Sequence, residues 1–137
     1  MKKYLVITLS YILLFFNTNS FSNEIKKNEL KVGLLAPFSG QYKDLGDSIM
    51  FSLQMALDEI GNKRVTIVTR DSGSGDKTIL NNSIQEIINE GVKVIIGPIN
   101  FEDFEEVKKY KDTIFISPSN INPKIENNII SIGVSLE

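Results

Sequence analysis

Cysteine and histidine are both absent from this sequence of 137 residues. Their absence excludes a Ser-His-Asp triad, a Cys-His dyad and any metal site built from thiolate or imidazole ligands. It also excludes disulfide bonds and a lipid attached to a cysteine near the amino terminus. We therefore expect a protein that is not an enzyme, that carries no metal and no cofactor, and whose stability depends on burial alone.

A large excess of charge of either sign is also lacking. The 15 basic and 17 acidic residues give a formal net charge of −2. Mild acidity without a basic stripe argues against nucleic acid as a partner. The length is sufficient for one domain but not for two.

A long apolar run occurs at residues 4–16, near the amino terminus. It follows Lys2 and Lys3 and precedes Ser20-Phe21-Ser22, which has the small-residue pattern of a signal-peptidase site. A membrane anchor is the weaker alternative, because the run is shorter than the roughly 20 residues of a spanning helix. We predict a signal peptide at residues 1–22, a disordered lead-in at 23–30 and no membrane span after cleavage. Cleavage removes two lysines and no acid, so 13 basic and 17 acidic residues leave a net charge of −4.

The remaining chain is organised around residues 31–60. The apolar run Val32–Ala36 predicts a strand that is covered on both faces, and Pro37 ends it. A helix pattern begins near Gly46-Asp47, where the carboxylate of Asp47 would meet free backbone N–H groups, and it ends at Gly61. The apolar stripe of this helix consists of Ile49, Leu53, Ala56, Leu57 and Ile60.

Strands and helices continue to alternate downstream. Asp76 is expected to cap a second helix that Gly91 ends, and a shorter helix contains Phe104 and Val107. Further strands are predicted at residues 64–69, 92–96, 113–117 and 129–134, and polar alternation places the first of these at an edge. This pattern predicts an α/β fold with an open parallel sheet, strand order 2-1-3-4-5 and helices on both faces. The ligand crevice of such a sheet lies between strands one and three.

Three predicted helices leave one face of the five-stranded sheet thinly covered. An edge strand that simply ends the domain would explain this. We prefer the interpretation that residues 31–137 are the front part of a longer protein, because all-parallel sheets are covered on both faces.

The segment at residues 71–78 reads DSGSGDKT and resembles a phosphate-binding loop. Such a loop needs glycine at its first and sixth positions, so that backbone N–H groups can surround the phosphate. Both positions are acids here, Asp71 and Asp76, and they would repel it. We interpret the segment as a turn followed by a helix cap.

Polar side chains follow the strands at the edge where the crevice is predicted. Neutral hydroxyl and amide groups suit an uncharged polar group of a ligand. These side chains belong to Ser39, Asn100, Ser117, Ser119 and Asn120. Each of them could equally serve as a turn residue. The helical spacing of Phe101 and Phe104 favours a place in the core for both, and the acids around them are typical of a solvated face.

The order and spacing of several motifs resemble a known family. The motifs are P-x-S-G at residues 37–40, D-x-G-x at 71–74, G-V-x-x-I-I-G-P at 91–98 and I-S-P at 116–118. The series resembles the amino-terminal lobe of type 1 periplasmic binding proteins of the leucine/isoleucine/valine-binding branch, over residues 31–134. The receptor domain of penicillin-binding-protein activators has a similar series.

This resemblance implies a two-lobed receptor that closes on a small molecule, such as an amino acid, and delivers it to an ABC permease. In that family the contacts from this lobe come from the loops after strands one, three and four. The matching positions here are Phe38, Ser39, Asn100, Phe101, Ser117, Ser119 and Asn120. Ile99-Asn100-Phe101 stands where a hydroxyl residue usually follows G-P, and Ile121 replaces a usual Thr. Both departures count against an α-amino acid as the ligand and leave the fold undisturbed.

The leading hypothesis is an exported, periplasmic solute-binding protein of an ABC-type uptake system, or its amino-terminal part. The alternative is a periplasmic protein-interaction module that resembles the activators of cell-wall synthesis. Stabilisation by a small metabolite would favour the first, and co-purification with a protein partner would favour the second. An extracytoplasmic enzyme is the weakest hypothesis, and turnover that disappears in Asp71→Asn would revive it.

Overall fold

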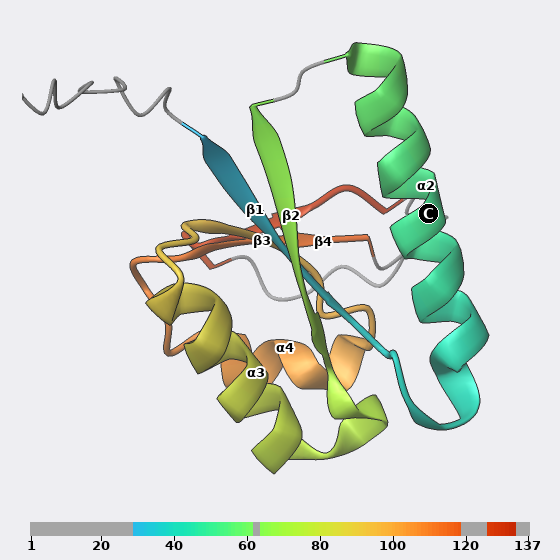
Figure 1. Cartoon of the computed structure of the whole chain (residues 1–137). Coiled ribbons are helices and arrows are strands. Elements are labelled where there is room, and N and C mark those ends of the chain that lie inside the picture. The colour runs from blue at the N-terminus through green and yellow to red at the C-terminus, as the bar shows by residue number, and fades with distance from the viewer. Residues whose placement is uncertain (1–28, 62–63, 119–125, 134–137) are drawn as a thin grey trace, which may run out of the picture.

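The structure, a computed structural model, describes residues 29–61, 64–118 and 126–133. These residues form a five-stranded, all-parallel sheet in the order β2-β1-β3-β4-β5 (Figure 1). The strands are β1 (Leu30–Ala36), β2 (Val65–Asp71), β3 (Val94–Ile96), β4 (Ile114–Ser117) and β5 (Ile129–Ser131). The helices are α2 (Lys43–Ile60), α3 (Lys77–Asn89) and α4 (Phe104–Val107), with 3-10 turns at Gly40–Tyr42, Gly73–Gly75 and Phe101–Asp103.

The fold class and the strand order predicted from the sequence are confirmed. The β1 strand pairs with β2 on one side and β3 on the other, so that Val32 lies opposite both Ile67 and Val94. The β2 strand forms an edge, as its polar alternation indicated. The β1 strand begins at Leu30, within the predicted lead-in, whereas the signal peptide and the rest of the lead-in lie outside the described residues.

The helices lie on both faces of the sheet, with α3 and α4 on one face and α2 on the other (Figure 1). The hydrophobic core fills the space between the sheet, α3 and α4. Its buried members are Leu35, Val68, Leu80, Ile84, Ile87, Val92, Ile95, Phe104, Val107, Phe115 and Ile129. The α3 helix contributes Leu80, Ile84 and Ile87 to this core. Its predicted cap is confirmed, because the carboxylate of Asp76 accepts hydrogen bonds from the backbone N–H groups of Thr78 and Ile79.

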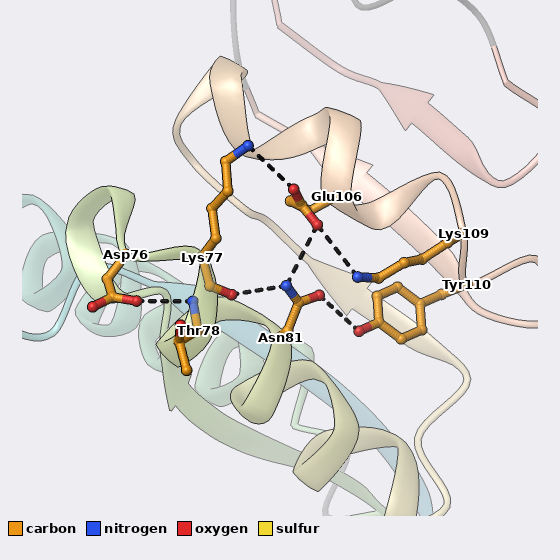
Figure 2. Close-up of polar contacts among 7 residues, drawn as sticks. All are labelled: Asp76, Lys77, Thr78, Asn81, Glu106, Lys109 and Tyr110. Carbon is orange, nitrogen blue, oxygen red and sulfur yellow. Dashed lines mark hydrogen bonds and ion pairs between the residues drawn. The ribbon is translucent and has the colours of Figure 1, made fainter.

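A polar network holds α3 against α4 at the rim of this core (Figure 2). The carboxylate of Glu106 accepts a hydrogen bond from Asn81 at 3.4 Å and forms ion pairs with Lys77 at 3.2 Å and Lys109 at 3.3 Å. The hydroxyl of Tyr110 donates to the side-chain oxygen of Asn81 at 2.9 Å. Hydrogen bonds from Lys77, Asn81 and Lys109 lower the pKa of Glu106.

The start of α2 differs from the prediction. The helix begins at Lys43, so Asp47 lies a full turn inside it and pairs with Lys43 instead of capping free N–H groups. The glycine that suggested a helix boundary, Gly46, is buried within the helix, where an added Cβ would lie 2.1 Å from the carbonyl oxygen of Pro37. This glycine permits the close approach of the helix to the preceding loop. The predicted end at Gly61 is confirmed by its left-handed conformation.

The described residues cover the face of the sheet toward α2 only in part. Gly46 is the one buried residue of α2, and the predicted stripe is at most half-buried, with Ile60 68% exposed. On the sheet, Ile114 and Ile130 are 41% and 50% exposed, because they alternate with Phe115 and Ile129, which face the core. Among the described helices, none combines the length and the apolar character that crossing a membrane requires.

Candidate functional site

A pocket of about 460 Å³ lies where β1, β2 and β3 end. Three loops line it, and each follows one of these strands at its carboxyl end, which is where open parallel sheets bind ligands. The lining residues are Pro37, Gln41, Tyr42, Leu45, Ser72, Ser74, Gly75, Ile99, Asn100 and Glu102. The predicted location of the crevice, beside β1 and β3, therefore coincides with a cavity of a size that suits a small solute.

Asp71, the last residue of β2, joins the first two loops. Its Oδ1 atom accepts hydrogen bonds from the backbone N–H of Phe38 at 2.9 Å and of Gly73 at 3.0 Å. A second link runs from the hydroxyl of Ser74 to the carbonyl oxygen of Ser39 at 2.8 Å. Together these bonds hold the loop after β1 and the loop after β2 in one arrangement, and both loops contribute residues to the pocket.

The same hydrogen bonds decide the protonation of Asp71. Burial alone would raise the pKa of its carboxyl, but hydrogen bonds from Ser39, Gly73 and Phe38 outweigh burial and lower it. Asp71 is therefore ionised at neutral pH, and its carboxylate accepts hydrogen bonds from both of the loops that it joins. The glycine-rich segment after it forms a 3-10 turn followed by the Asp76 cap, which is the turn and cap that its sequence indicated.

The third loop follows β3 and approaches β1 very closely. Gly97 has φ +107°, and a Cβ added to it would lie 2.1 Å from the carbonyl oxygen of Leu35. The peptide between Gly97 and Pro98 is cis. Beyond it, the side chain of Asn100 accepts a hydrogen bond from the backbone N–H of Glu102 at 3.3 Å and so fixes the turn that carries both residues into the pocket wall.

The residues predicted from the resemblance are distributed unevenly around the pocket. Asn100 lines it. Phe38 and Ser39 lie beside it and contribute the hydrogen bonds described above, whereas Phe101 is 38% exposed and Ser117 is fully buried, and neither lines the pocket. The predicted core position is confirmed for Phe104 and is wrong for Phe101. Ser119, Asn120 and Ile121 lie outside the described residues.

Several lining residues were not predicted. Ser72 and Ser74 belong to the segment that was interpreted only as a turn, and Gln41 and Tyr42 belong to a 3-10 turn that precedes the predicted helix. The predicted strand order could have identified Ser72 and Ser74 as lining residues. The loop after β2 must lie beside the loop after β1 when the two strands are neighbours.

Acidic groups gather beside the pocket, but they do not form a metal centre. Among residues 29–61, 64–118 and 126–133, no group of three or more acidic side chains could hold a metal ion. Burial raises the pKa of Asp103, and the nearby charge of Glu102 raises it further. Within the described part of the chain, Glu102 is the only charged side chain that lines the pocket.

We expect the Asp71→Asn variant to be less stable at neutral pH by about 1–3 kcal/mol, because charge-assisted hydrogen bonds to both loops are weakened. The wild-type carboxyl has a lowered pKa in the folded state, so its contribution is present above its unfolded pKa and is lost as the pH falls through the folded value. Urea denaturation between about pH 2 and 7 should therefore show a smaller loss of stability on acidification for Asp71→Asn than for the wild type. Asp76→Asn is the control, because Asn caps helices as well as Asp does, and equal effects of both substitutions would contradict the role of Asp71.

Comparison with protein families gives a match over residues 29–134, a range that includes every described residue, and the family is described as periplasmic binding protein. The chain belongs to the periplasmic binding protein family. The resemblance predicted from its motifs is confirmed. Comparison with curated protein sequences gives no match.

Solved structures of this family and its relatives share the fold. A solute-binding protein of an ABC transporter from R. palustris, in complex with benzoate, is 26% identical with a TM-score of 0.64, and the match covers 74% of this chain and 32% of that one. An ABC-type branched-chain amino acid transporter from Rhodopseudomonas palustris is 17% identical with a TM-score of 0.59, covering 76% of this chain and 32% of that one. LpoA from Haemophilus influenzae is 20% identical with a TM-score of 0.63, covering 82% of this chain and 21% of that one. The chain thus spans about a third or less of the length of these proteins.

Proposed function

We propose that this chain is a lobe of a periplasmic solute-binding protein that serves an ABC-type uptake system. The observation that carries the proposal is the pocket of about 460 Å³ at the carboxyl ends of β1, β2 and β3. Its neutral polar groups, Ser72, Ser74, Gln41 and Asn100, can orient a small polar solute such as an amino acid. The role is binding, without a chemical reaction.

We further propose that the native receptor has two lobes and that residues 31–137 form the amino-terminal one, after an export signal at residues 1–22. Similar solved structures are about three times as long as the matched region, which supports a second lobe. The pocket is also open at Tyr42 and Leu45, which are 53% and 46% exposed, so a facing lobe would complete its wall. The exposed apolar side chains of α2 and of Ile114 and Ile130 are consistent with further covering structure.

The second candidate is a protein-interaction module, and the likeness to LpoA and the outer face of α2 favour it. Phe51 and Met55 lie one turn apart on α2 and are 62% and 57% exposed. Exposed apolar side chains of this size are typical of contact surfaces. This candidate requires no solute in the pocket.

Thermal unfolding of the native protein in the presence of a panel of small solutes separates the two candidates. A solute that binds the folded state raises the melting temperature. The stabilisation grows with the logarithm of the solute concentration and reaches about 2.7 kcal/mol at a free concentration one hundred times Kd. We expect such a shift for at least one solute, and we expect it to be weaker in Asn100→Ala. Unchanged melting with every solute, together with a stoichiometric protein partner, would support the interaction module instead.

A further inference from the structure

We infer that this lobe receives the positively charged end of its ligand, and that its solutes are small amines, amino acids included, rather than solutes whose only charge is a carboxylate. The inference rests on the proposed function and specifies the ligand of the same pocket. Two features of the lining carry it, the charge of Glu102 and the aromatic ring of Tyr42.

The charge of the pocket wall is negative. Glu102 is exposed in the lining, and among the residues that the structure describes neither a Lys nor an Arg contributes to the lining. Among the described residues, ion pairs engage the neighbouring acids Glu105 and Glu106, and none engages Glu102. A carboxylate without a cationic partner at the mouth of a pocket attracts an ammonium group and repels a second carboxylate.

The lysines next to the pocket do not offset this charge. Lys43 follows Tyr42 directly but pairs with Asp47, on the next turn of α2. Lys77 follows the loop after β2 but pairs with Glu106, and Figure 2 shows its ammonium group directed toward α4. Each of these lysines therefore has an acidic partner of its own, and a ligand carboxylate would have to compete with that acid.

The apolar part of the lining also suits an organic cation. Tyr42 is 53% exposed, and it lines the pocket together with Leu45 and Ile99. Ammonium groups bind favourably to the faces of aromatic rings, and the attraction grows when the contact is removed from water. An ammonium group between a carboxylate and an aromatic ring gains from both. The hydroxyl of Ser72, the hydroxyl oxygen of Ser74 as an acceptor and the amide NH2 of Asn100 as a donor then serve neutral polar atoms of the ligand.

The test is a set of three probes of nearly the same shape, namely benzylammonium, benzyl alcohol and benzoate, titrated into the native protein by calorimetry. We expect benzylammonium to bind about tenfold more tightly than benzoate, with benzyl alcohol between them. In Glu102→Gln this difference should shrink to about twofold, because the charge is removed while the shape of the side chain is kept. Glu105→Gln is the matched control, since Glu105 lies three residues further along, pairs with Lys108 and does not line the pocket.

Each outcome has a defined meaning. Equal or tighter binding of benzoate, or a preference for benzylammonium that survives in Glu102→Gln, would overturn the inference and leave the solute-binding function standing. Amide NMR shifts at Ser72, Ser74 and Asn100 would establish that the probes occupy this pocket. Absence of binding by all three probes up to about 10 mM would count against the solute-binding function as well.

Discussion

Replacing Gly97 with Ala is expected to destabilise the protein by more than about 3 kcal/mol. A large fraction of the molecules should then be unfolded at 37 °C. The added Cβ would lie 2.1 Å from the carbonyl oxygen of Leu35, a backbone atom of β1 that cannot rotate away. The backbone of Gly97 also has φ +107°, which side chains disfavour. Because Gly97 connects β3 to the third loop of the pocket, the substitution should also abolish solute binding.

The control for Gly97→Ala is Gly91→Ala. Gly91 has φ +84°, yet no atom lies within 4 Å of its added Cβ, so only the backbone preference is lost there. We expect Gly91→Ala to cost about 1–2 kcal/mol. Urea denaturation measures both variants, and a Gly97→Ala variant that is no less stable than Gly91→Ala would contradict the close approach of the third loop to β1.

Truncating Phe115 to Ala should cost about 3–5 kcal/mol of unfolding free energy. Its side chain is fully buried in the core between the sheet, α3 and α4, and its ring lies 6.3 Å from that of Tyr110. Removal of the ring leaves a cavity that the surrounding β-sheet cannot close. The free energy of unfolding from urea denaturation, with an unchanged dependence on denaturant, is the measurement.

Phe101→Ala makes the same chemical change at an exposed position. Phe101 is 38% exposed on the turn that precedes α4, and it does not line the pocket. We expect this variant to lose less than about 1 kcal/mol. A large loss for Phe101→Ala, or a small one for Phe115→Ala, would show that the core does not lie where the structure places it.

The fold was predictable because hydrophobic pattern and strand order are linked by general rules. Apolar runs such as Val32–Ala36 indicate buried parallel strands, and right-handed crossovers then leave few possible orders. The start of α2 was mispredicted because Gly46 reads as a helix boundary, whereas the structure uses it for a contact with the carbonyl of Pro37. That contact joins residues nine positions apart in the sequence, and no local pattern encodes it.

The location of the candidate site could be predicted from the sequence, whereas most of the residues that line it could not. Parallel strands end at one edge of the sheet, so Asn100 after β3 and Ser39 after β1 were expected there. The contribution of Ser72 and Ser74 depends on Asp71, which fastens the loop after β2 to the loop after β1. Short loops rich in Gly and Ser have the same composition whether they are simple turns or pocket walls, and only the three-dimensional arrangement distinguishes the two.

Native mass spectrometry of the protein, isolated without added ligand from the cells that produce it, tests the central claim most directly. It reports the mass of the mature polypeptide and of anything bound to it. A polypeptide that carries one small solute, and that loses it when Asn100 and Glu102 are replaced by Ala, is the predicted result. A polypeptide that carries no solute and is found in a stable complex with another protein would contradict the account and identify the fold here as an interaction module.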